Sequence, residues 1–186
     1  MKKLFKGKLA KTVWLLILVF FIIILTFPKW ISMFYPEPHQ EIVFSAANEF
    51  DVDPYLIFAI IRVESKYQTS AKSPAGALGL MQIMPETAKW IAKQNQIEDF
   101  KLEDLHDPEI NIRFGSWYLA NLMQEYNEIP LVIAAYNAGR GKVATWINDG
   151  IWSGDTKELE NIPFKETRIY VENVLKSYAA YRAVYQ

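Results

Sequence analysis

The chain has 186 residues, of which 51% are hydrophobic and 15% aromatic, so it holds one domain with attachments and enough apolar side chains for a packed core. It has no cysteine, which excludes disulfides, thiolate metal sites and a thiol nucleophile, and neither His39 nor His106 begins a metal-binding motif. Five lysines within residues 1–11 precede an acidic body in a chain of net charge −1, and this charge pattern predicts no nucleic-acid partner. Without cysteines or a histidine motif no metal is predicted, and no cofactor either.

The first element is an uncharged run, TVWLLILVFFIIILTF, at residues 12–27. As a helix it would be about 24 Å long, somewhat shorter than the hydrocarbon core of about 30 Å, and apolar residues on both sides extend the match. Lysines ahead of such a run predict a cytoplasmic N-terminus. The sequence therefore predicts a basic cytoplasmic tail at 1–11, a single-pass anchor in the cell membrane at 12–27, and a body on the extracytoplasmic face.

Two other interpretations of this run stay open. A cleaved signal peptide has the same basic start and apolar middle, but it needs a small-residue cleavage site, and FPKWISMFYPEP offers only bulky or proline-flanked positions. A buried core helix fits less well, because the run is apolar on every side and lies beside the lysines. The retained anchor is favoured, and residues 28–40, which contain three prolines, are interpreted as a linker.

From Glu41 onward, helical spacings and helix-start signals recur without a convincing alternating strand. Asp53 and Asp107 are each followed by proline, which is typical of an N-cap and the first turn of a helix. Gly139 is expected to end a helix as a left-handed C-cap. Helices are predicted over residues 41–50, 141–148 and about 164–184. Three more are predicted to start at residues 53, 85 and 107, and another to end at residue 139. The fold predicted for residues 41–186 is an all-α domain.

The helix that starts at Asp53 ends on a glutamate, Glu64. Helical spacing places this residue on one face with three isoleucines, Ile57, Ile60 and Ile61. Burial and the negative end of the helix dipole should both raise the pKa of Glu64, and a carboxylic acid that keeps its proton near neutral pH can donate it. The ordinary alternative is a glutamate that reaches water or pairs with a nearby cation, Arg62, Lys66 or Arg168.

Three later stretches carry polar residues that could lie near a ligand. The loop SPAGALGLMQIMPETA begins nine residues beyond Glu64, and its glycines and prolines permit an irregular path that holds Gln82 and backbone amides close to a bound molecule. AAYNAG places Tyr136 and Asn137 at a helix end. ETRIYVENVL places Glu166 and Tyr170 on one face of the last helix. Taken singly, each stretch is weak evidence.

Together and in this order, these motifs resemble the soluble lytic transglycosylase family, whose catalytic domain has a lysozyme-like fold close to that of goose-type lysozyme. The resemblance covers about residues 41–184 and rests on ES at 64–65, GLMQIMP at 79–85, AYNAG at 135–139 and the ETRIYV start of the last helix. It implies an all-α, lysozyme-like domain, preceded here by a single transmembrane helix. It also implies an enzyme of cell-wall remodelling whose partner is the glycan strand of peptidoglycan.

Within that resemblance, Glu64 occupies the position of a single catalytic acid and base. It is implied to protonate the β-1,4 bond between N-acetylmuramic acid and N-acetylglucosamine and then to take the proton of the C6 hydroxyl, which closes a 1,6-anhydro ring without water. The positions implied to bind substrate are Ser73, Gln82, Met84, Tyr136, Asn137, Glu166 and Tyr170. The predicted partners are the glycan strand and the cytoplasmic membrane. Protein partners in an assembly that spans or synthesises the wall stay open.

Sugar grooves commonly stack ring faces on aromatic side chains. Core packing is expected for Trp90 and Trp117, whereas Trp152, within NDGIWSGD, is the better groove candidate. Two other functions stay open: a muramidase of the same fold, in which water attacks the sugar, and a wall-binding scaffold with an inert body.

Overall fold

The computed structural model describes residues 11–24 and 33–186. The chain forms two compact units, one of residues 1–36 with 184–186 and the other of residues 37–183. Residues 1–10 and 25–32 lie outside the described residues, and with them most of the predicted basic tail, the end of the predicted anchor and the first part of the linker.

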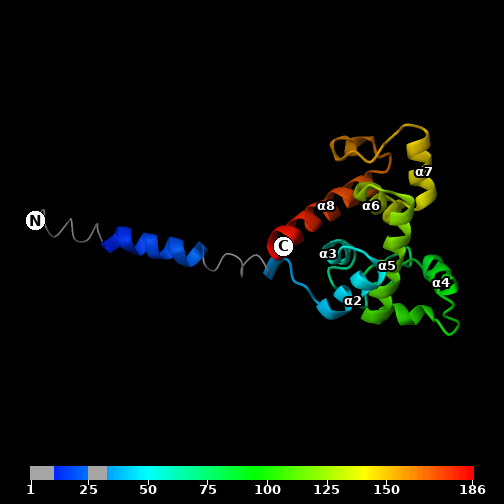
Figure 1. The fold of residues 1–186 in the computed structure, drawn as a ribbon, viewed down its shortest axis with the longest axis horizontal. Helices are drawn as coiled ribbons and strands as arrows, with labels where there is room; N and C mark the ends of the chain where they lie inside the picture. The colour runs from blue at the N-terminus through cyan, green and yellow to red at the C-terminus, as the bar shows by residue number, and fades with distance from the viewer. Residues whose placement is uncertain (1–10, 25–32) are drawn as a thin grey trace, which may run out of the picture. The chain divides into compact units, whose positions relative to one another are not determined.

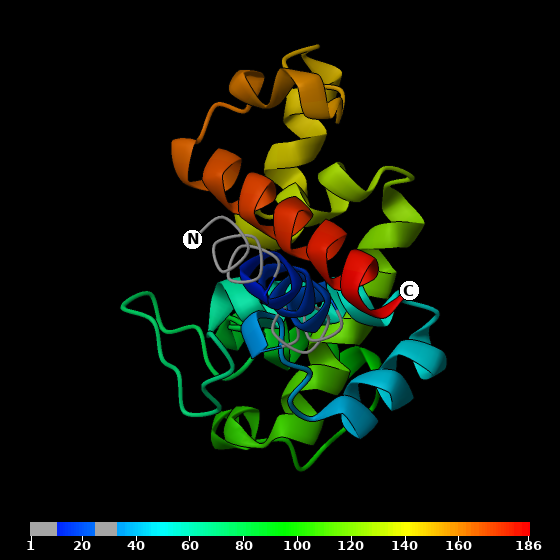
Figure 2. The ribbon, with the colours of Figure 1, turned by 90° about the vertical axis from the view of Figure 1, so that its left-hand side faces the viewer.

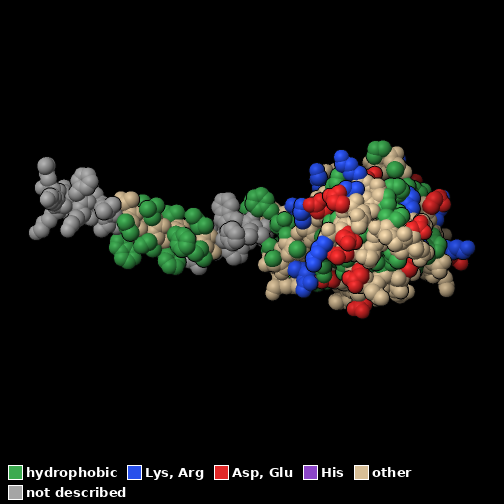
Figure 3. Space-filling model, turned by 90° about the horizontal axis from the view of Figure 1, so that it is seen from above, with side chains coloured by type: hydrophobic (Ala, Val, Ile, Leu, Met, Phe, Trp, Pro, Cys, Tyr) green, Lys and Arg blue, Asp and Glu red, His purple; other side chains and the backbone are tan. Residues whose placement is uncertain are grey.

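Residues 11–24 of the first unit are helical, and their apolar side chains are exposed along the helix (Figure 3). Trp14, for example, is 70% exposed. Across residues 11–24 and 33–186, no helix is both long enough and apolar enough to span a membrane. Residues 25–27 of the expected span fall outside these ranges, and the anchor stays a prediction.

The second unit is built from helices, as the sequence predicts (Figure 1). Its α-helices are α2 (Gln40–Phe50), α3 (Pro54–Glu64), α4 (Pro85–Gln94), α5 (Pro108–Glu125), α6 (Ile129–Ala138), α7 (Arg140–Asn148) and α8 (Lys165–Tyr185). Two 3-10 helices, η1 (Leu102–His106) and η2 (Thr156–Asn161), lie within the connections and were not predicted. Each is too short to show a helical hydrophobic period.

Helix α3 is the central element of this unit (Figure 1). All of its residues from Tyr55 to Ile61 are buried, and Phe58 stacks on Tyr181 of α8 with ring centroids 5.5 Å apart. Helix α2 packs against α3 and α5, and α5 also contacts α4, α6 and η1. The predicted apolar stripe was therefore too narrow, because neighbours cover α3 on every side and not on one face only.

The helix starts follow the predicted capping chemistry. Asp53 accepts a hydrogen bond from the Tyr55 amide at 2.8 Å, and Asp107 accepts from the Glu109 amide at 2.8 Å. The second carboxyl oxygen of Asp53 accepts from the Tyr178 hydroxyl at 2.6 Å, so the cap also ties α3 to α8.

The left-handed cap predicted for Gly139 is wrong. Its φ is 90° and its ψ is 141°, which is an extended conformation at positive φ. Helix α7 begins at the very next residue, Arg140. Gly139 therefore joins two helices without a loop, and this connection requires a different ψ from that of a left-handed cap.

The long connection between α3 and α4, residues 65–84, forms a folded loop. Two isolated bridges, from Lys72 to Leu78 and from Leu78 to Ile83, tie it together. In Figure 2 this loop lies on the left of the body and α2 on the right. The loop therefore folds back on itself directly after Glu64, the last residue of α3.

Candidate active site

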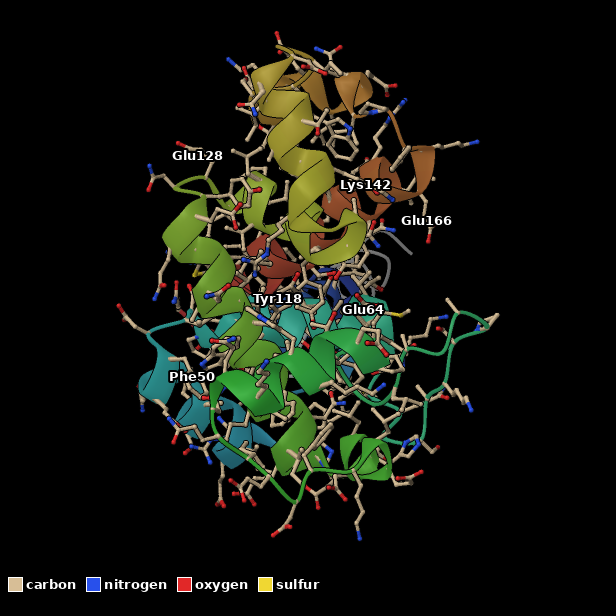
Figure 4. The ribbon with its side chains drawn as sticks, turned by 90° about the vertical axis from the view of Figure 1, so that its right-hand side faces the viewer. Phe50, Glu64, Tyr118, Glu128, Lys142 and Glu166 are labelled. Atoms are coloured by element: carbon tan, nitrogen blue, oxygen red, sulfur yellow. The ribbon has the colours of Figure 1, made fainter. Side chains whose placement is uncertain are left out.

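Glu64 is the last residue of α3 and is half-buried, where the central helix leaves the core. Its Oε1 accepts a hydrogen bond of 2.7 Å from the hydroxyl of Tyr170 in α8. Arg168, one of the cations considered as its partner, pairs instead with Glu160. Figure 4 labels Glu64 and Glu166 on the same side of the body. The carboxyl group thus has a neutral donor as its hydrogen-bond partner.

The environment raises the pKa of Glu64 from 4.5 to about 7. Burial is the largest cause, because it disfavours the charged carboxylate, and the nearby negative charge of Glu166 acts in the same direction. The hydrogen bond from Tyr170 opposes both, because it favours the charged form. At neutral pH the group is therefore present both as an acid and as a base.

Two tyrosines, the half-buried Tyr136 and the buried Tyr170, complete the cluster around this carboxyl group. Burial and the charge of Glu64 hold the pKa values of Tyr136 and Tyr170 well above their usual value, so both keep their protons. Tyr136 donates to the backbone carbonyl of Met81 at 2.8 Å. Tyr170 is only 7% exposed, and its hydroxyl contacts Glu64. The structure therefore brings Glu64, Tyr136, Tyr170 and Glu166 together from three helices.

A residue that sequence reasoning missed, Asn111 of α5, holds the loop next to this cluster. Its Oδ1 accepts from the Met81 amide at 2.8 Å, and its Nδ2 donates to the carbonyls of Leu78 and Leu105 at 3.0 and 2.8 Å. Asn111 is 1% exposed. A signal was present in the sequence, because an amide side chain on the buried face of a helix needs several partners.

Gly79 permits this close approach of the loop to Asn111. A Cβ at this position would lie 2.1 Å from the carbonyl oxygen of Leu105 and 2.2 Å from Nδ2 of Asn111. Its φ of +76° also disfavours any other residue. The glycine and the asparagine together fix the path of the backbone through Met81, whose carbonyl binds Tyr136.

The predicted loop residues have different surroundings. Ser73 Oγ accepts from the Ala77 amide at 2.9 Å, and Gln82, at φ 48°, donates through Nε2 to the Gly79 carbonyl at 2.8 Å. Both side chains therefore stabilise the loop itself. Met84 is 42% exposed directly before α4, and Asn137 is half-buried in the last turn of α6.

The prediction for Trp152 is wrong. This side chain is 1% exposed and its Nε1 donates to the backbone carbonyl of Asp155 at 3.0 Å, so it belongs to the core. Trp90 and Trp117, for which core packing was expected, are half-buried and contact each other edge to face with centroids 5.1 Å apart. Among the described residues, no group of three or more His, Cys, Asp or Glu side chains could hold a metal ion.

The chain is similar to known lytic transglycosylases. The family model described as "Transglycosylase SLT domain" matches residues 41–158, and one described as "Soluble lytic transglycosylase helical domain" matches residues 161–186. The soluble lytic murein transglycosylase of Salmonella typhimurium is 44% identical over 135 residues, which is 71% of this chain and 21% of the relative. The chain thus spans about a fifth of that protein's length.

Two further relatives extend the comparison. The crystal structure of the 70 kDa soluble lytic transglycosylase from Escherichia coli superposes with a TM-score of 0.76 at 37% identity, over 82% of this chain and 25% of that one. The membrane-bound lytic murein transglycosylase C of Haemophilus ducreyi is 36% identical over 107 residues, which is 52% of this chain and 29% of the relative.

The raised pKa of Glu64 should make the fold less stable as the pH rises from 4.5 to 7. In this window the unfolded chain releases a proton that the folded chain keeps. The free energy of unfolding therefore falls, by up to about 3 kcal/mol above pH 7. Glu64→Gln, which stays neutral, should therefore match the parent near pH 4 and exceed its stability near pH 8 in urea unfolding. Glu103→Gln, at an exposed glutamate, is the control. Equal stability of parent and Glu64→Gln at pH 8 would contradict the raised pKa.

Asn111→Ala should release the loop. It leaves a buried amide and two carbonyls without their bonds, and the expected loss of unfolding free energy is about 3 kcal/mol. Hydrogen exchange at the Met81 amide should accelerate more than global unfolding accounts for. The control Asn95→Ala removes one bond at the end of α4, at 2.9 Å from Ile91, and should cost about 1 kcal/mol. Unchanged protection at Met81 would show that Asn111 does not hold the loop.

Proposed function

The chain belongs to the transglycosylase SLT domain family, and from this premise we propose that residues 41–186 form a peptidoglycan lytic transglycosylase. The proposed reaction cleaves the β-1,4 bond between N-acetylmuramic acid and N-acetylglucosamine and forms 1,6-anhydro-N-acetylmuramic acid. The observation that carries the proposal is the carboxyl group of Glu64, whose pKa of about 7 suits a group that must first give a proton and then take one. The murein transglycosylases among the relatives support the substrate class.

In the first step Glu64 acts as the acid. Its proton passes to the glycosidic oxygen, the bond from C1 of muramic acid to that oxygen breaks, and the N-acetylglucosamine end leaves with a new hydroxyl group. The N-acetyl oxygen of the same sugar stabilises the positive charge at C1. Tyr170 donates to the carboxylate that forms, so the hydrogen bond of 2.7 Å stabilises the enzyme between the two steps.

In the second step Glu64 acts as the base. The carboxylate takes the proton of the C6 hydroxyl, and O6 attacks C1 to close the anhydro ring. The nucleophile belongs to the bound sugar, so proximity lowers the barrier and no water is consumed. This second step restores the protonated form of Glu64. If the pKa of Glu64 were far below 7, that protonated form would be disfavoured at neutral pH.

The remaining predicted positions are proposed to hold the glycan. Met84 is exposed beside the loop, Asn137 follows Tyr136, and Ser73, Gln82 and Glu166 lie on the loop and on the first turn of α8. Ser73 and Gln82 use one polar function each inside the loop and keep another, a hydroxyl proton and an amide oxygen, for substrate.

A hydrolytic muramidase is a second candidate, and one observation favours it. Glu166 lies near enough to raise the pKa of Glu64 through its charge. A second carboxylate beside the acid is what a glycosidase needs to activate water. The two reactions differ in product mass, because hydrolysis adds one water to the new reducing end.

Membrane attachment is a separate part of the proposal. We propose that residues 12–27 anchor the chain, with a cytoplasmic N-terminus and the enzymatic body on the extracytoplasmic face, where peptidoglycan lies. The uncharged run, the lysines ahead of it and the exposed apolar side chains of residues 11–24 support this arrangement. The relative from Haemophilus ducreyi is named membrane-bound, which supports attachment to a membrane of some kind.

Digestion of purified peptidoglycan followed by mass spectrometry tests the reaction. The parent chain should release fragments ending in 1,6-anhydro-N-acetylmuramic acid, and Glu64→Gln should slow release by about a hundredfold or more, because general acid-base catalysis is lost. Glu103→Gln should keep the parental rate. Fragments heavier by one water would establish the muramidase, and undiminished release by Glu64→Gln would overturn the assignment of the acid.

Fractionation of cells tests the anchor. The full chain should remain with the membrane fraction after washes in high salt, because apolar burial and not surface charge would hold it. A chain lacking residues 1–27 should leave that fraction. Release of the full chain by salt alone, or a mature N-terminus beyond residue 27, would exclude a retained anchor.

A further inference from the structure

The turn of residues 65–67 follows Glu64 directly and has no part in the proposed proton transfers. Its backbone is strained, because Lys66 has a φ of 50° and Tyr67 a φ of 67°. Among the described residues, they are the only two neighbours in the chain that both have a positive φ. A side chain disfavours this left-handed region, so each of the two residues costs free energy. The turn therefore needs contacts with its surroundings to persist.

Ser65, the second residue of the ES motif, closes the turn from within. Its amide donates to the Ile61 carbonyl at 3.1 Å, and its hydroxyl donates to the same carbonyl at 3.2 Å. The hydroxyl oxygen also accepts from the Tyr67 amide at 3.1 Å. The buried serine thus joins the last turn of α3, which carries Glu64, to the left-handed residues after it.

Tyr67 connects the turn to the rest of the body. Its hydroxyl group and that of Tyr181 in α8 hydrogen-bond each other. Tyr181 is fully buried, and its ring stacks on that of Phe58 in α3 with 25° between the ring planes. A tyrosine side chain has only two torsions ahead of its ring, so a change of backbone conformation at Tyr67 would carry the hydroxyl away from Tyr181. The pair therefore holds the turn against a fixed point in the core.

Helix α8 thus fixes Glu64 in two ways. Tyr170 donates to the carboxyl group itself at 2.7 Å, whereas Tyr181 holds the backbone that follows Glu64. The two tyrosines lie about three helical turns apart, so they share one face of α8. The hydrogen bond from Tyr170 requires the end of α3 to stay in place, and the turn is the segment that could release it.

We infer that the Tyr67–Tyr181 pair positions Glu64 for the reaction by holding the turn after it in the left-handed conformation. Both are positioning residues, because they act on the carboxyl group through the backbone. The inference rests on the proposed function, since it takes Glu64 as the acid and base. Without the pair, the turn would relax, and the carboxyl group would spend part of its time away from Tyr170. The result would be a lower kcat with KM little changed.

The test compares Tyr67→Phe and Tyr181→Phe with the parent, as full chains, in the cleavage of soluble glycan strands of peptidoglycan. Each variant removes one hydroxyl group and keeps the ring. Each should lower kcat about tenfold and leave KM within about twofold. The double variant should be no slower than the slower single variant, because the two hydroxyl groups act as one pair. In a nuclear magnetic resonance titration, the midpoint of Glu64 should fall from about 7 toward 4.5, since a loosened helix end admits water.

Tyr178→Phe is the matched control. It removes another hydroxyl group of α8, which donates to Asp53 at 2.6 Å at the opposite end of α3. This variant should be less stable in urea unfolding, because it loses a hydrogen bond to a carboxylate. It should keep the parental kcat and the parental midpoint of Glu64.

The possible results separate the inference from the proposed function. A parental kcat or a parental Glu64 midpoint in folded Tyr67→Phe would overturn the inference. A loss of kcat equal to that of Tyr178→Phe, or a change confined to KM, would overturn it too. If Tyr181→Phe does not fold, Tyr67→Phe decides, because Tyr67 is only half-buried. If the parent cuts no strand, the proposed function fails, and the Glu64 midpoint of Tyr67→Phe decides the inference.

Discussion

The burial of one carboxyl group at the end of α3 governs the rest of this structure. Helix α3 is covered on all sides from Tyr55 to Ile61, and Glu64 lies in its last turn, where the helix emerges from the core. Burial and the charge of Glu166 raise the pKa of Glu64, and the Tyr170 hydrogen bond limits the rise to about 7. A fully exposed glutamate would be a poor acid at neutral pH, and a fully buried one would be a poor base. The position at the edge of the core permits both roles.

The surroundings of Glu64 depend on residues that have no part in the chemistry. Asn111 and Gly79 fix the loop from inside, so that the carbonyl of Met81 meets Tyr136. Tyr136 in turn lies between the carboxyl cluster and Tyr118, which lines a neighbouring cavity. The same packed core that raises one pKa therefore also sets the position of the loop and of the aromatic surface beside it.

Local chemistry was predictable from the sequence. The caps at Asp53 and Asp107, the helical class and the family all follow from short patterns, and the structure and the comparisons confirm them. Burial of Glu64 was also predictable, because three isoleucines precede it at helical spacing. The catalytic and substrate-binding roles remain proposals, as does the anchor, part of which lies outside the described residues.

Contacts between distant segments were not predictable. Tyr170 meets Glu64 across 106 residues, and no local pattern gives its hydroxyl as the partner of that carboxyl group. The tryptophans illustrate the same limit, since Trp152 in a glycine-rich loop is buried while Trp90 on a helix lines a cavity. Whether a tryptophan faces the core or solvent depends on the packing of neighbouring helices, which one sequence does not specify.

The central claim is that the folded chain holds Glu64 as an acid at neutral pH. The most direct test is to follow the carboxyl carbon of Glu64 by nuclear magnetic resonance while the pH of the folded protein is raised, with Glu64→Gln to assign the signal. A midpoint near 7 is the result that the structure predicts, and a midpoint near the ordinary value of 4.5 would contradict it.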